Sequence, residues 1–136
     1  MFLLTFLLLF ISSPKEKIYI ENEWIRSANK GMNTAFYFDV KNDSDKPDTL
    51  YKVASDLSEI IQMHETYSNG DMMGMREVKN IVIDPHSTFN FKPGSHHVML
   101  IKLKKNLKDK QTGEITLYFK NAGELKVKAP IKNSIK

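Results

Sequence analysis

The 136-residue sequence contains no cysteine. The chain therefore forms no disulfides, binds neither zinc nor an iron–sulfur cluster through thiolates, and performs no thiol catalysis. A blue-copper centre is excluded for the same reason, because its strongest ligand is a thiolate. The lack of disulfides does not prevent folding, since a chain of this length can bury a core without crosslinks.

Long hydrophobic runs are scarce, and the longest one, MFLLTFLLLFI, occupies residues 1–11. It is shorter than the roughly 20 residues of a membrane-spanning helix, and it has the length of a signal-peptide core. Ser12 and Ser13 follow it. We expect residues 1–16 to be a leader, either a signal peptide cleaved near Ser13 or an uncleaved anchor, and the protein to act in the periplasm or elsewhere outside the cytoplasm. A buried first strand is the alternative, although the run lacks polar alternation.

The net charge of +4 is unevenly distributed. Residues 102–136 contain ten lysines against Asp109, Glu114 and Glu124, which gives +7 and leaves −3 for the remainder. A basic face of this kind could meet an acidic partner or anionic lipid, or it could be a solvated surface. We expect no nucleic-acid binding, because the lysines are dispersed and no aromatic stacking motif accompanies them.

Short strand-like segments separated by turn-forming residues follow from Lys17 onward. The segments alternate apolar and polar positions or are rich in aromatic and β-branched residues, and no long helical period occurs. This pattern predicts one all-β domain over residues 17–136, a β-sandwich or small Greek-key barrel. The nine candidate strands are Lys17–Ile20, Thr34–Lys41, Thr49–Ala54, Glu59–Glu65, Met75–Val78, Thr88–Phe91, His97–Leu103, Glu114–Phe119 and Glu124–Ala129.

The segment His97–Leu103, HVMLIKL, is the most informative of these strands. Residues two apart in a strand share a face. His97 and Met99 should therefore point the same way, with Ile101 and Leu103 further along that face. The Pro-Gly turn just before the segment places His97 and Met99 near an end of the sandwich.

Methionine and histidine gather in one part of the chain. Five of the seven methionines and all four histidines lie between residues 63 and 99. Thioether and imidazole together suit copper(I), whereas zinc prefers thiolate, imidazole and carboxylate, and calcium or magnesium prefers oxygen. These residues could instead be core fillers. Met72 and Met73 argue against that alternative, because they follow Gly70 and Asp71 in an apparent surface loop.

Four of these residues have a specific spacing. His64 is followed by ten residues and Met75, and then by 21 residues and the His97-Val98-Met99 sequence. This pattern resembles, without a gap, the signature of the PCu(A)C family of periplasmic copper chaperones. The resemblance also selects His97 as the ligand rather than its neighbour His96.

The resemblance covers residues 17–131. Trp24-Ile25-Arg26 is similar to the family's Trp-x-Arg, and the segment 92–97 to its Pro-Gly-Gly-x-His turn. Segments 117–119 and 127–130 resemble its last hairpin. Two positions depart from the pattern: Ser95 replaces the second glycine of the turn, and Glu65 stands where some members carry a methionine.

The resemblance implies a cupredoxin-like β-barrel and a function in copper transport. It implies one copper(I) ion per chain, held by His64, Met75, His97 and Met99, and no catalytic residues. The implied recipients are the copper centre of cytochrome c oxidase and Sco-type proteins. We expect a monomer that contacts membranes only through an uncleaved leader. A copper-buffering protein of the cell envelope and a metal-free β-sandwich interaction module are the alternatives.

Overall fold

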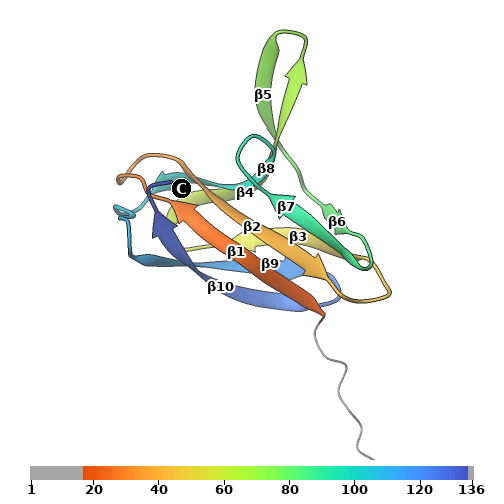
Figure 1. Ribbon diagram of the computed structural model, residues 1–136. Helices are drawn as coiled ribbons and strands as arrows, with labels where there is room; N and C mark the ends of the chain where they lie inside the picture. The colour runs from red at the N-terminus through yellow and green to blue at the C-terminus, as the bar shows by residue number, and fades with distance from the viewer. Residues whose placement is uncertain (1–16, 135–136) are drawn as a thin grey trace, which may run out of the picture.

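The computed structural model describes residues 17–134, which form ten β-strands (Figure 1). No membrane-crossing helix is present in this part of the chain. The expected leader, residues 1–16, lies outside the described residues. The strands are β1 (Ile18–Arg26), β2 (Thr34–Asn42), β3 (Asp48–Ala54), β4 (Ser58–Asn69), β5 (Met72–Glu77), β6 (Ile81–Ile83), β7 (Ser87–Phe91), β8 (His96–Leu103), β9 (Thr112–Phe119) and β10 (Gly123–Lys132).

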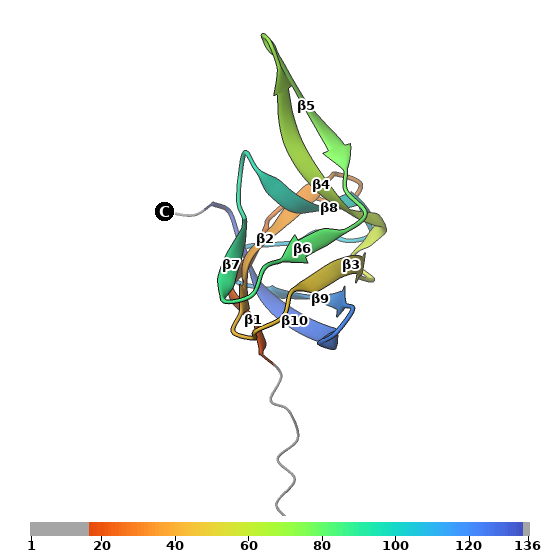
Figure 2. The same ribbon diagram turned by 90° about the vertical axis from the view of Figure 1, so that its right-hand side faces the viewer.

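The strands form two layers that pack face to face (Figures 1 and 2). One layer has the order β5-β4-β8-β7-β2-β1 and the other the order β10-β9-β3-β6. The layers join where β1 runs parallel to β10, with Ile25 opposite Ile131. β2 is shared along one side, because β8 pairs with its first half and β7 with its second half. The prediction of an all-β sandwich is confirmed.

The core lies between the layers and is dominated by aromatic and branched side chains. Phe36, Phe38 and Phe91 stack in series, with ring centroids 4.5 and 4.2 Å apart. Val98 and Leu100 of β8 are fully buried beside them. Burial of each such side chain contributes about 1.5–3 kcal/mol, so the inward face of β8 is firmly anchored.

The outward face of β2 is also covered, by a small second cluster. Ala35 and Tyr37 lie on this face and are buried together with Trp24 of β1. The Trp24 and Tyr37 ring centroids are 5.0 Å apart. The guanidinium of Arg26 lies 5.7 Å from the Trp24 ring and 5.6 Å from the Tyr37 ring. This cluster therefore covers part of the outer face of the sheet with closely packed side chains.

The β4–β5 hairpin projects beyond the sandwich (Figures 1 and 2). Tyr67 of β4 lies opposite Gly74 of β5, and its ring covers the glycine. A Cβ atom at position 74 would be 2.7 Å from the Tyr67 hydroxyl. Arg76 lies 4.9 Å from the Tyr67 ring and forms an ion pair with Glu65. These contacts hold the two strands together on one face of the hairpin.

Several predicted boundaries were wrong. The prediction missed β6, which has only three residues. Met72 and Met73 belong to strand β5 rather than to a loop, although both are 74% exposed. The burial of side chains does not alternate between core and solvent along β5, because this part of the hairpin lies outside the sandwich. Trp24 lies within β1 and not after it, beyond a bulge at Asn22, whose φ is +54°.

The predicted face of Leu103 was also wrong. Leu103 is buried in the core with Val98 and Leu100, and it does not share the face of His97. Lys102, just before it, has φ +57° and donates its backbone N–H to the Asn33 side chain. This left-handed residue interrupts the two-residue alternation, so the strand returns Leu103 to the core.

Candidate metal site

The four residues with the predicted spacing come from three neighbouring strands. His64 lies on β4, Met75 on β5, and His97 and Met99 on β8, with β4 in the middle. His64 is directly opposite His97, and Met75 is opposite Thr66, two residues beyond His64. Since opposite residues and residues two apart share a face, all four side chains lie on one face of the sheet.

This is the outer face, because the alternate positions point into the core. Met63 and Val98, the neighbours of His64 and His97, are both buried there. The sandwich thus anchors β4 and β8 from behind, and the four donors stand on its other side. Their placement follows from strand alternation together with the pairing of β4 with β5 and β8.

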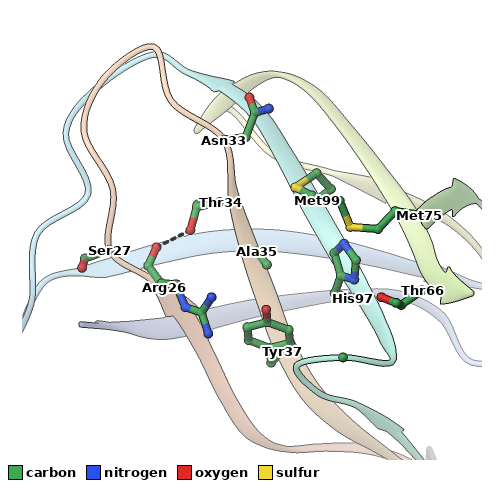
Figure 3. A pocket seen from close by; sticks show the side chains of 11 residues that line it. Arg26, Ser27, Asn33, Thr34, Ala35, Tyr37, Thr66, Met75, His97 and Met99 are labelled. Carbon is green, nitrogen blue, oxygen red and sulfur yellow. Dashed lines mark hydrogen bonds between the residues drawn. The ribbon is translucent and has the colours of Figure 1, made fainter. Parts of the chain in front are cut away.

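Three of the four donors line one cleft of about 320 Å³. Figure 3 shows Met75 reaching from the hairpin toward the His97 ring, with Met99 beside it on β8. Tyr37 and Arg26 line the other part of the cleft. His64 does not line it, but its ring centroid lies 5.6 Å from that of His97. The structure therefore brings all four predicted residues to one place.

The site is closed on one side and open on the other. His97 is only 5% exposed, and the Tyr37 ring lies 6.4 Å from it, centroid to centroid. Met75 is 54% exposed because it belongs to the projecting hairpin. An ion at this place would be fixed from the sheet side and reachable from the hairpin side.

The ring nitrogens of the two histidines fit a soft metal ion. His64 Nε2 lies 2.9 Å from the Gln62 side-chain oxygen, and His64 Nδ1 is buried without a hydrogen-bond partner. A buried polar atom with no partner is costly, and a metal ion would satisfy it. His97 Nδ1 lies 3.5 Å from the Ser95 carbonyl oxygen, which leaves Nε2 for ligation.

Burial keeps both imidazoles in the neutral form that binds metals. It lowers the pKa of His64, an effect that the Glu77 carboxylate partly reverses. Burial also lowers the pKa of His97; the Ser95 carbonyl raises it, and the charges of His64 and His96 lower it further. A neutral ring has a lone pair for a metal, so the site is ready for ligation near pH 7.

The other histidines are held elsewhere. His96 points away from His97, contacts Glu65 at 3.3 Å and packs edge-on against Phe89. His86 pairs with Asp45 in an exposed turn. Across residues 17–134, no three His, Asp or Glu side chains form a group that could hold a metal ion.

Sequence reasoning missed the residues that surround the donors. Gln62 and Thr66 flank His64 on the same face of β4, and Tyr37 closes the cleft from β2. The two-residue alternation around His64 could have identified Gln62 and Thr66. Tyr37 could not have been found in this way, because its position depends on the pairing of β2 with β8.

A model of the LpqE-like family, described as "Putative lipoprotein LpqE-like", matches residues 18–131. A protein of Leifsonia xyli subsp. xyli named "Putative lipoprotein" is 31% identical over 85% of this chain and 70% of its own length. An uncharacterized protein of Rickettsia prowazekii is 29% identical over 75% of this chain and 59% of its own length.

Solved structures share the fold. The copper-bound PCuAC domain from PmoF2 superposes with a TM-score of 0.73 and 29% identity, over 87% of this chain and 94% of that domain. CuI-DR1885 from Deinococcus radiodurans gives a TM-score of 0.66 and 30% identity, over 86% of this chain and 80% of that protein. The predicted cupredoxin-like fold is confirmed by these matches. The chain thus belongs to the LpqE-like family and has the cupredoxin-like β-sandwich fold of PCuAC domains.

Proposed function

We propose that this protein binds one copper(I) ion through His64, Met75, His97 and Met99 and delivers it to another protein. The observation that carries the proposal is the convergence of these four donors on one sheet face beside one cleft. The similarity to a copper-bound PCuAC domain and to CuI-DR1885 supports the choice of metal.

The donor set suits a carrier rather than an enzyme. Two imidazoles and two thioethers are neutral ligands, so the bound ion keeps its charge of +1. Thiolates are softer and charged, and they hold copper(I) more strongly. The half-exposed Met75 is the ligand that an incoming thiolate could replace first. We therefore propose acceptors with cysteine ligands, such as a Sco-type protein or the copper centre of cytochrome c oxidase.

We also propose that the protein works outside the cytoplasm. Its matching relative from Leifsonia is named a lipoprotein, and the family description uses the same word. The apolar run at residues 1–11 is consistent with export. Mass spectrometry of the protein from its native envelope should show a mature start near Ser13, and recovery of the intact chain in the cytosol would contradict this location.

Binding is tested by anaerobic titration against a copper(I) chelator. We expect saturation at one ion per chain. Met75→Leu should lower the affinity at least about tenfold. Met72→Leu is the matched control, because Met72 is exposed on the same strand but faces the other way. A stoichiometry of zero, preference for zinc over copper(I), or equal losses in both variants would contradict the site.

Delivery needs a second experiment. Copper-loaded protein is mixed with a reduced Sco-type acceptor, the two proteins are separated, and the copper on each is counted. We expect transfer to the acceptor and none to a control acceptor whose two cysteines are replaced by serine. Copper that stays on this chain with a reduced acceptor in excess would favour copper buffering instead.

A further inference from the structure

Gln62 stands beside the metal donors without being one of them. It precedes His64 by two residues on β4, shares its face, and lies opposite Met99 of β8. Its side-chain oxygen Oε1 is 2.9 Å from His64 Nε2. Within residues 17–134, no other side chain or backbone atom forms a hydrogen bond with the His64 ring.

This contact determines where the imidazole carries its proton. An amide oxygen only accepts hydrogen bonds, so His64 Nε2 must donate. A neutral imidazole has a single N–H group, and Nδ1 therefore holds the free lone pair. That atom is the buried one without a partner. The lone pair thus lies on a buried atom of a residue whose side chain shares the sheet face of the other donors.

The opposite arrangement would prevent Nδ1 from binding a metal ion. If the Gln62 amide were turned round, its NH2 group would donate to Nε2, and the proton would move to Nδ1. Nδ1 would then carry a buried N–H group and would have no lone pair for a metal ion. Only the arrangement in which Gln62 accepts leaves a lone pair on Nδ1 that a bound ion could satisfy.

We propose that Gln62 is a positioning residue that fixes the Nε2–H tautomer of His64 and so assigns Nδ1 as its copper-binding atom. This inference rests on the proposed function, since it concerns the same site. A residue that hydrogen-bonds to a metal-binding imidazole orients the ring before the ion binds. Loss of such a residue typically reduces metal affinity 10–100-fold.

The first test uses the copper-free protein, so its outcome does not depend on copper binding. Long-range 1H–15N correlation spectra of histidine-labelled protein distinguish the two tautomers. We expect His64 to show a protonated Nε2 and a bare Nδ1. A protonated Nδ1 would overturn the proposal, whatever the affinity of the chain for copper. If the tautomer is as expected but copper(I) does not bind, the proposed function fails and the tautomer assignment stands.

The second test compares two variants of Gln62. Gln62→Leu has a similar volume but no acceptor; it should give a mixture of His64 tautomers and a 10–100-fold lower copper(I) affinity. Gln62→Glu keeps an acceptor oxygen and should retain the Nε2–H tautomer and most of the affinity. Thermal unfolding checks that both variants fold. Unchanged affinity in Gln62→Leu, or a copper-induced change in the 15N signal of Nε2 rather than Nδ1, would overturn the assignment.

Discussion

His96 and His97 are adjacent in the sequence but lie on opposite faces of β8. His97 belongs to the outer-face cleft, whereas His96 is held by Glu65 and Phe89. His97→Ala should therefore lower copper(I) affinity at least about tenfold, and His96→Ala should change it much less. Competition with a copper(I) chelator measures both. A larger loss in His96→Ala would mean that the wrong histidine has been assigned.

Met99→Leu separates ligation from packing. Leucine keeps the volume and apolar character of methionine, so the folding free energy should change by less than about 1.5 kcal/mol. Copper(I) affinity should fall at least about tenfold, because position 99 no longer offers a sulfur ligand. Denaturant unfolding and chelator competition on the same preparation give the two numbers. A large loss of stability with unchanged affinity would make Met99 a packing residue.

Acid should release copper from the protein. Burial lowers the pKa values of His64 and His97, so both rings stay neutral below the ordinary value of about 6.5. We expect constant affinity from about pH 8 to 7 and a steep decline below about pH 6, where protons compete for the lone pairs. The thioethers do not titrate. Affinity that stays flat from about pH 7.5 to 5 would contradict histidine ligation.

The lowered pKa values of His64 and His97 also affect the stability of the copper-free protein. In acid, the unfolded chain takes up protons at these two histidines at a higher pH than the folded chain does, because the folded pKa values are the lower ones. The free energy of unfolding should therefore rise with pH through the region just below about pH 6.5. This part of the stability should disappear in a variant that lacks both histidines.

Some of these residue-scale properties could be predicted from the sequence. The spacing of His64, Met75, His97 and Met99 identifies candidates that the structure places together. The depth of His97 could not be predicted, because Tyr37 and the hairpin that surround it come from distant segments.

The β4–β5 hairpin is the element that carries Met75 into the site, and Gly74 allows its two strands to close. Gly74→Ala would place a Cβ 2.7 Å from the Tyr67 hydroxyl. The Tyr67 ring must then swing away, and the strand that holds Met75 loses a cover. We expect a several-fold loss of copper(I) affinity with little change in thermal stability, since no residue from 64 to 77 belongs to the main core.

A double variant provides the control for this prediction. In Gly74→Ala with Tyr67→Ala, the added methyl group no longer meets a ring, so it should lower the affinity only slightly compared with Tyr67→Ala alone. If Gly74→Ala reduces affinity equally in both backgrounds, the close approach of Tyr67 is not the cause.

At the scale of elements, alternation predicted most strands but not their ends. Strands with one face on the core and the other in solvent, such as β9 and β10, show clear two-residue periods of burial. β5 lies outside the sandwich and is exposed along most of its length, so no hydrophobic period marks it. β6 is too short for any period to appear.

At the scale of the whole molecule, the uneven charge bears on partner encounter. Residues 102–136 have a net charge of +7. If these lysines steer an acidic acceptor, the rate of copper transfer should fall as ionic strength rises from about 0.05 to about 0.5 M. The copper(I) affinity of the isolated protein should not change over this range. Stopped-flow measurements of transfer supply the rates, and a rate independent of salt would make the lysines a solvated surface.

The projection of the hairpin has a mechanical consequence. In the part of the chain that the structure describes, β5 is an edge strand whose backbone pairs only with β4. An ion bound by both Met75 and the β8 donors would link β5 to β8, the strand on the other side of β4. Hydrogen exchange at the amides of residues 72–77 should therefore slow on copper loading, while the core amides of β9 barely respond. The mobility of the hairpin end would then differ between the copper-loaded and the copper-free protein. A docking protein could sense this difference before any copper ligand is exchanged.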